Sequence, residues 1–346
     1  MVATRPSGGR PRRADLVLSG GGVKGIGLVG AVGALVDAGY EVQRVSGTSA
    51  GSLVGAVVAA ASQRDPLSSE QLRDLALSVP YRKFGDSGPI ERIPLVGTAW
   101  GLLRETGIYR GDFAHDWLRS ELNNVGVSTF GDLAVDDDHL LPERRYRLVV
   151  TVTDLTTGQL VRLPWDYRRL YGRDPDEQSV ADAVRASMAI PFLYRPVTLK
   201  NAAGQPCTLV DGGVLSNFPI DSFDRPDGRE PRWPTFGVTV VPYLPAPKIE
   251  QLIPGLDRLP WGGPSFLESL ITTMLVGHDQ AYLSQPWVKA RAIQVDSTGV
   301  GVLDFDITRQ DTKALYDKGY SATTEFLSTW NWPSYLDRFR RAHGVD

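Results

Sequence analysis

A single serine between small residues is the first candidate for chemistry in this chain. Ser49 lies in the stretch Gly47-Thr48-Ser49-Ala50-Gly51, a G-x-S-x-G pattern. Between a strand and a helix, this pattern is typical of a nucleophilic serine held in a sharp turn. Serines in Gly-rich turns also cap helices without any chemical role. The pattern by itself leaves both interpretations open.

The nucleophile interpretation gives the flanking glycines a steric role. Side chains at Gly47 and Gly51 would collide with the flanking helix and block approach to the hydroxyl. Ser49 would then project into open space at the positive end of a helix that begins at Ala50. About half an elementary charge at that helix end favours a developing alkoxide or oxyanion.

A second glycine-rich loop follows an earlier apolar run. Its sequence is SGGGVKG, from Ser19 to Gly25. The spacing of Gly20, Gly22 and Gly25 also fits a weak dinucleotide-binding fingerprint, but that fingerprint expects an acidic residue after the second strand, where the serine turn stands instead. Lys24 precedes Gly25 with no hydroxyl after it, so the loop is no phosphate loop either. The consecutive glycines instead expose N–H groups that could form an oxyanion hole, each worth around 10²–10³ in rate.

A nucleophilic serine needs a base. The histidines do not stand at strand ends beside turns, so we expect surface or packing roles for His115, His139, His278 and His343. Asp211 is better placed, because it follows a short apolar strand and precedes Gly212 and Gly213. An isolated Asp-Gly pair would be interpreted as a turn. Together with Ser49 and the triple glycine, it favours a catalytic carboxylate.

The elements that carry these residues repeat one arrangement. A strand over 16–18 leads through the glycines into a helix that ends near Gly39, and a strand over 42–45 leads through the serine turn into a helix that ends near Ser62. Two such units predict parallel strands joined by crossover helices, and therefore an α/β layered fold.

Further elements are expected along the chain. They are a hairpin of 146–155 and 159–164 across TTG, a helix over 180–187, strands over 208–210, 235–241 and 292–295, and helices in the last fifty residues. Residues 1–13 are interpreted as a disordered basic tail and 14–346 as a single domain. We interpret the Pro-rich stretch 221–247 as a surface connection with one buried strand inside it.

Composition excludes several classes of function. A net charge of −3 and a pI near 5.9 disfavour nucleic-acid binding. The one cysteine, Cys207, excludes an intramolecular disulfide and a multi-cysteine metal site. The sequence has no stretch of 18 apolar residues and no signal-peptide core, so we expect a cytoplasmic protein without a membrane span. Contact with a membrane surface and the oligomeric state stay open.

Taken together, these motifs resemble those of patatin-like phospholipases. GGGVKG resembles the family's oxyanion loop, which ends in a basic residue and a glycine, here Lys24 and Gly25. GTSAG resembles its nucleophile elbow, and DGG at 211–213 its base motif. The stretches 106–118, 150–164 and 185–197 add to a likeness that runs from about 15 to 217. The resemblance implies a three-layer α/β/α fold with a mostly parallel central sheet.

The resemblance also implies a mechanism. Ser49 would attack an ester carbonyl, Asp211 would take its proton, and N–H groups of Gly20, Gly21, Gly22 and Ala50 would hold the oxyanion. Water would then release the fatty acid, and no metal or cofactor is expected. An aspartate can serve as base when burial raises its pKa. Lys24 would make the loop more positive or meet a phosphate headgroup, or would simply be solvated.

Substrate and alternatives rest on weaker features. The apolar stretches 93–103 and 265–275, with Trp100 and Trp261, suit an acyl channel or a membrane-facing rim, and core packing is the alternative. A catalytically silent lipid-binding or scaffold protein is the main competing function. A nicotinamide- or flavin-dependent enzyme is a second. The sequence leaves headgroup, chain length and positional preference open.

Overall fold

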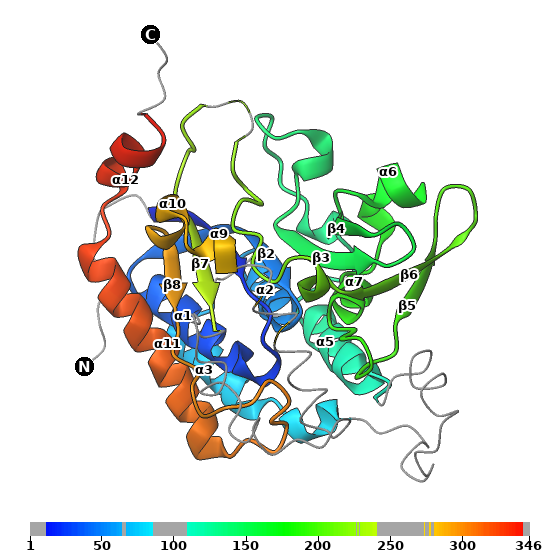
Figure 1. Ribbon diagram of the computed structural model, residues 1–346, viewed down its shortest axis with the longest axis horizontal. Coiled ribbons are helices and arrows are strands. Elements are labelled where there is room, and N and C mark those ends of the chain that lie inside the picture. Colours follow the sequence, from blue (N-terminus) through cyan, green and yellow to red (C-terminus); the bar gives the residue numbers. More distant parts are fainter. Residues whose placement is uncertain are drawn as a thin grey trace.

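A mixed eight-stranded sheet forms the centre of the molecule, with helices packed against it (Figure 1). The computed structural model describes residues 12–63, 67–85, 109–225, 229–240 and 280–341, together with Asp227, Thr273 and Gly277. The strands are β1 Arg12–Leu18, β2 Tyr40–Thr48, β3 Leu148–Asp154, β4 Gln159–Leu163, β5 Val197–Lys200, β6 Pro206–Asp211, β7 Thr235–Thr239 and β8 Ala292–Gln294.

Helices of four to 21 residues surround the sheet in the described chain. They are α1 Ile26–Asp37, α2 Ala50–Ala61, α3 Ser69–Ser78, α5 Asp112–Asn124, α6 Tyr167–Tyr171, α7 Val180–Ser187, α9 Gln280–Leu283, α10 Pro286–Lys289, α11 Arg309–Thr329 and α12 Trp332–Phe339. The helix over 180–187, the hairpin across TTG and the two strand–loop–helix units are confirmed. The apolar stretches 93–103 and most of 265–275 lie outside the described residues, as do His278 and His343.

The sheet is less parallel than expected. The strand order is β5-β6-β3-β2-β1-β7-β8, with β4 paired to β3. Strands β3, β2, β1, β7 and β8 run parallel, which the crossover helices predicted. Strands β4, β5 and β6 join through antiparallel ladders. Tight turns account for the β3–β4 and β5–β6 ladders.

The first strand begins earlier than the predicted tail allows. Arg12 and Arg13 belong to β1, where they pair with Tyr40 and Glu41 of β2. Their side chains are exposed. The start of this strand is therefore defined by backbone pairing alone, and the side-chain pattern gives no sign of it. Residues 1–11 lie outside the described part, and the single-domain assignment stays a prediction.

Alternation along β1 places apolar side chains on both faces of the sheet. Leu16 and Leu18 join the main core, whereas Val17 joins a smaller cluster that includes Val288 of α10. Side chains on successive strand residues point to opposite faces, so this division shows a layer of helices on each side. The three-layer arrangement is therefore confirmed.

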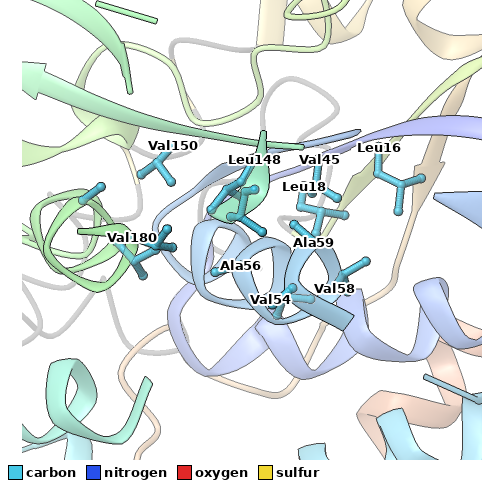
Figure 2. Close-up of a cluster of buried hydrophobic side chains, with 14 of the residues drawn as sticks. Leu16, Leu18, Val45, Val54, Ala56, Val58, Ala59, Leu148, Val150 and Val180 are labelled. Carbon is cyan, nitrogen blue, oxygen red and sulfur yellow. The ribbon is translucent and has the colours of Figure 1, made fainter. Parts of the chain in front are cut away.

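Helix α2 lies close beneath the sheet because its sheet-facing residues are small. Figure 2 shows Leu18, Val45 and Leu148 of the sheet above α2, and Val54 on the opposite side of that helix. A Cβ built on Gly55 would lie 2.9 Å from Cγ1 of Val45, so glycine permits the close approach. The position of α2 fixes where its N-terminus, and hence Ser49, meets the sheet.

Candidate active site

Ser49 occupies a strained turn between β2 and α2. It follows Thr48, the last residue of β2, and precedes Ala50, the first residue of α2. Its φ of 52° and ψ of −124° lie outside the regions that L-residues favour, and only 3% of its surface is exposed. Such a conformation costs about 1–3 kcal/mol and persists only where the surrounding structure imposes it.

The glycines around Ser49 make this turn possible. A Cβ on Gly47 would lie 2.3 Å from the carbonyl oxygen of Gly51, within α2. A Cβ on Gly51 would lie 2.3 Å from the carbonyl oxygen of Leu18, at the end of β1. Both distances are far below van der Waals contact, so neither position accepts a side chain without a shift of the backbone.

Asp211 ends β6 and is 1% exposed. Its Oδ1 accepts a 2.8 Å hydrogen bond from the Gly213 N–H. Burial raises the pKa of Asp211 from 3.8 to about 7, while hydrogen bonding to the Ser49 hydroxyl and the Gly213 N–H opposes that rise. Oδ2 nevertheless has no partner of full hydrogen-bond geometry among the described residues. The Ser49 hydroxyl therefore lies close enough to affect the pKa of Asp211, but without the geometry of a full hydrogen bond.

Strand β3 explains how two residues 162 positions apart become neighbours. Thr48 of β2 pairs with Thr151, and Asp211 of β6 pairs with Val152, the next residue of β3. Along residues 150–154, one edge of β3 pairs with β4. Both β2 and β6 therefore pair with the opposite edge of β3. One runs parallel and the other antiparallel to β3, so their ends converge there. Ser49 and Asp211 stand at that convergence.

The triple-glycine loop lies against the elbow. A Cβ on Gly20 would lie 3.0 Å from Cβ of Ser49, and one on Gly25 would lie 2.9 Å from Cβ of Ala50. The N–H of Gly20 donates to the carbonyl of Asn217 at 3.2 Å, so it is engaged within the protein. Among the described residues, no acceptor is recorded for the N–H groups of Gly21, Gly22 and Ala50. These three are the donors that remain for an oxyanion.

The structure contradicts one of the roles expected for Lys24. Its backbone N–H donates to the carbonyl of Gly21, and only 7% of its surface is exposed. The interpretation as a solvated lysine is therefore wrong. Its other roles stay predictions.

Two polar residues beside the elbow were not singled out by sequence reasoning. The Ser187 hydroxyl accepts a hydrogen bond from the Ser49 N–H at 2.8 Å. The Asn217 side chain donates to the Gly20 carbonyl at 3.4 Å, closing a second link between that loop and the chain after β6. Both residues lie in stretches that carry the family resemblance, but no local pattern marks their contact with residues about 140 to 200 positions away.

The histidines in the described part lie away from this site. His115 of α5 bonds through Nε2 to Asp182 of α7 at 2.7 Å and through Nδ1 to Asp116 at 3.2 Å. The hydrogen bond to Asp182 is the main reason why the pKa of His115 is raised. His139 is exposed.

An apolar pocket opens beside Ser49. Its empty volume, including the mouth, is about 870 Å³. Ser49, Ala50, Leu53, Val54, Val57 and Val58 line it along one side of α2. The remaining walls come from α1, α3, the turn at 81–84, α5, and the stretches 188–194 and 302–305. At 1.5 Å per residue, the lining of α2 runs about 13 Å from the serine.

Within the described residues, no three His, Cys, Asp or Glu side chains gather in a way that could hold a metal ion. Nor does any helix in the same residues have the length and apolar character needed to cross a bilayer.

Comparison with known proteins places this site in a context. The family model described as patatin-like phospholipase matches residues 16–224. YqhO of Bacillus subtilis (strain 168), described as uncharacterized, is 33% identical over 92% of this chain and 99% of its own length. Lysophospholipase nte1 of Aspergillus niger is 28% identical over 61% of this chain, which is 11% of the fungal protein. The crystal structure of VipD from Legionella pneumophila superposes with a TM-score of 0.52 at 20% identity, covering 92% of this chain and 67% of VipD.

Proposed function

Because this chain belongs to the patatin-like phospholipase family, we propose that it is a serine lipid acyl hydrolase, which cleaves carboxylic esters through Ser49 and Asp211. The observation that carries this proposal is the convergence of the strained Ser49 turn and the buried Asp211 carboxylate at adjacent residues of β3. This pair of residues lies near the N-terminal end of α2, beside the apolar pocket that Ser49 lines. The name of the fungal relative, a lysophospholipase, supports a lipid substrate.

The first step is attack of the Ser49 oxygen on the ester carbonyl. Asp211 accepts the hydroxyl proton as the new C–O bond forms, and the carbonyl oxygen becomes an oxyanion. A general base works best when its pKa lies near the operating pH, and the buried Asp211 meets that condition at about 7. The usual aspartate value would leave the carboxylate too weak a base for this task.

The oxyanion is stabilised by N–H groups rather than by a cation in this proposal. The proposed donors are the free N–H groups of Gly21, Gly22 and Ala50, and the N-terminus of α2 adds its positive dipole end. Collapse of the intermediate breaks the ester bond, and the proton on Asp211 passes to the leaving alcohol. Water then attacks the acyl-enzyme while Asp211 accepts its proton. When the second intermediate collapses, Asp211 returns that proton to the Ser49 oxygen as the fatty acid leaves.

The pocket is proposed to receive the acyl chain. Its lining is aliphatic or aromatic except at the serine end, so a hydrocarbon chain would exchange water for apolar contacts worth about 25 cal/mol per Å² of buried surface. A polar headgroup has no matching partners along α2. The headgroup therefore stays on the solvent side of Ser49. The proposal does not specify which headgroup it is.

The test uses two variants and one control. Ser49→Ala and Asp211→Asn should each lower hydrolysis of a p-nitrophenyl ester at least about 10³-fold. Ser49→Ala should also lose labelling by a fluorophosphonate probe. Ser46→Ala is the control, because Ser46 is equally buried on β2 but bonds to Ser222. Full activity in Asp211→Asn would refute the pairing, and an unlabelled, inactive wild type would favour a silent lipid-binding protein.

A further inference from the structure

We propose that Ser187 is a positioning residue that holds the strained Ser49 backbone in its reactive conformation. This inference rests on the proposed role of Ser49 as nucleophile. Ser187 is the last residue of α7 and has no exposed surface. Its Oγ accepts the Ser49 N–H at 2.8 Å and donates to the Thr151 carbonyl at 2.7 Å. With one bond accepted and one donated, the hydroxyl cannot rotate without breaking a contact.

The Ser49 N–H has few other ways to be satisfied. Ser49 precedes α2 as its N-cap, so its own N–H points away from the helix's internal hydrogen bonds. The residue is 3% exposed, which leaves water little access. Loss of the Ser187 hydroxyl would leave a buried donor unpaired, and the turn could relieve that by relaxing toward a common backbone conformation. Such relaxation moves the Ser49 hydroxyl.

The chain segment 187–189 also holds the partner of Ser49. The N–H of Asp211 donates to the carbonyl of Ala189 at 3.0 Å. One three-residue segment, which we call the bracket, therefore bonds to the backbones of both Ser49 and Asp211. Its anchor at Thr151 is the β3 residue that pairs with Thr48. The separation of nucleophile and base is thus set by the bracket as well as by strand pairing.

The same contact bears on the oxyanion donors. The Ala50 N–H belongs to the peptide that directly follows Ser49, so the backbone angles of Ser49 set its direction. A hydroxyl that fixes Ser49 fixes this donor too. The hydrogen bonds of the Ser187 hydroxyl go to the Ser49 N–H and the Thr151 carbonyl, so we expect its effect to be on geometry. It should appear in turnover rather than in substrate affinity, since Ser187 is absent from the pocket lining while Met188 and Ile190 belong to it.

The test compares two buried serine hydroxyls in the full chain. Ser187→Ala removes the contact, and Ser187→Cys keeps nearly the same volume with a weaker hydrogen-bonding group. Ser46→Ala removes an equally buried hydroxyl on β2, three residues before Ser49, which bonds instead to Ser222 at 3.0 Å. Measurements are kcat and KM for a p-nitrophenyl ester, the rate of fluorophosphonate labelling, and the urea midpoint.

We expect Ser187→Ala to lower kcat and the labelling rate by about 10- to 100-fold with KM unchanged, because a small misplacement of a reactive group has effects of that size. Ser187→Cys should fall between Ala and wild type. Ser46→Ala should shift the urea midpoint but keep kcat within about twofold.

Equal kcat in Ser187→Ala and Ser46→Ala would overturn the inference, as would a loss confined to KM. If Ser187→Ala does not fold, wild-type kcat in Ser187→Cys decides against it. Ser49→Ala separates the two claims. Retained activity there would remove the proposed function together with the inference, whereas loss in Ser49→Ala beside a fully active Ser187→Ala would remove the inference alone.

Discussion

Replacing Asp211 by asparagine should make the protein more stable and less active at the same time. The buried carboxylate is held next to Ser49 at a cost, because burial disfavours its charged form. Asparagine has nearly the same shape and keeps an oxygen that can accept the Gly213 N–H. The substitution therefore removes the charge without removing the hydrogen bond.

The magnitude follows from the two pKa values. Asp211 has a pKa of about 7 in the folded protein against an ordinary value of 3.8. At about 1.4 kcal/mol per pKa unit, ionised Asp211 lowers the free energy of unfolding by roughly 4 kcal/mol above pH 7. Between these two values the unfolded chain releases the proton and the folded chain keeps it, so the cost shrinks as pH falls. It is about 1.5 kcal/mol near pH 5 and vanishes below pH 3.8.

The assay is urea unfolding of wild type and Asp211→Asn at pH 8 and pH 5. We expect the variant to be more stable at both, with the larger difference at pH 8. Asp15→Asn is a control for which we expect the opposite effect on the free energy of unfolding. Asp15 is equally buried, but it receives two hydrogen bonds from Arg44, at 3.2 and 2.5 Å. Breaking that pair should destabilise the protein. In parallel, wild-type kcat/KM should rise with pH about a midpoint near 7, as Asp211 loses its proton.

A variant that is less stable than wild type at pH 8 would refute this reasoning. So would a stability difference that does not change between pH 8 and pH 5. Either result would mean that Asp211 carries its charge without strain, and that burial does not set its basicity.

Three further predictions concern the surroundings of the site. Gly47→Ala should destabilise the protein by more than about 3 kcal/mol, because its Cβ would lie 2.3 Å from the Gly51 carbonyl, and an unchanged urea midpoint would contradict this. Ala76→Phe should fill the apolar pocket and lower kcat/KM at least about 10-fold for decanoyl but not acetyl esters of p-nitrophenol; equal effects on both would argue against an acyl pocket. His115→Gln should destabilise the protein most below pH 6.5, because the raised pKa of His115 beside Asp182 supplies stability there that is lost as pH rises through the folded value. Urea midpoints at pH 5.5 and 8.5 measure this, and a larger loss at pH 8.5 would contradict it.

Local chemistry made much of this protein predictable. The turn at Ser49 needs glycine at Gly47 because of a contact with Gly51, four residues on, so the local pattern identifies the turn directly. The same holds for the strand–loop–helix units, whose apolar periodicity depends on one face of each element. The predicted strand ends were less accurate. The strand that begins at Arg12 was predicted to start later, because exposed side chains carry no sign of backbone pairing.

The antiparallel strands show where local information stops. The sequence predicted a strand before Asp211 but assigned it no partner, and the family resemblance suggested a mostly parallel sheet. Pairing between β3 and β6 joins residues more than fifty positions apart, and nothing in either strand specifies the other. The Ser187 hydroxyl was missed for the same reason, since a serine at a helix end is common and its bond to Ser49 spans 138 positions.

The sequence by itself determined which residues could do the chemistry, because the conformation of a glycine-rich turn and the reactivity of a hydroxyl or carboxylate are properties of a few neighbouring atoms. Tertiary structure alone decided that β2 and β6 end at adjacent residues of β3, and that Asp211 is sealed from water there. Basicity depends on that burial, since removing solvent from a carboxylate penalises its charge in a way that no stretch of sequence specifies.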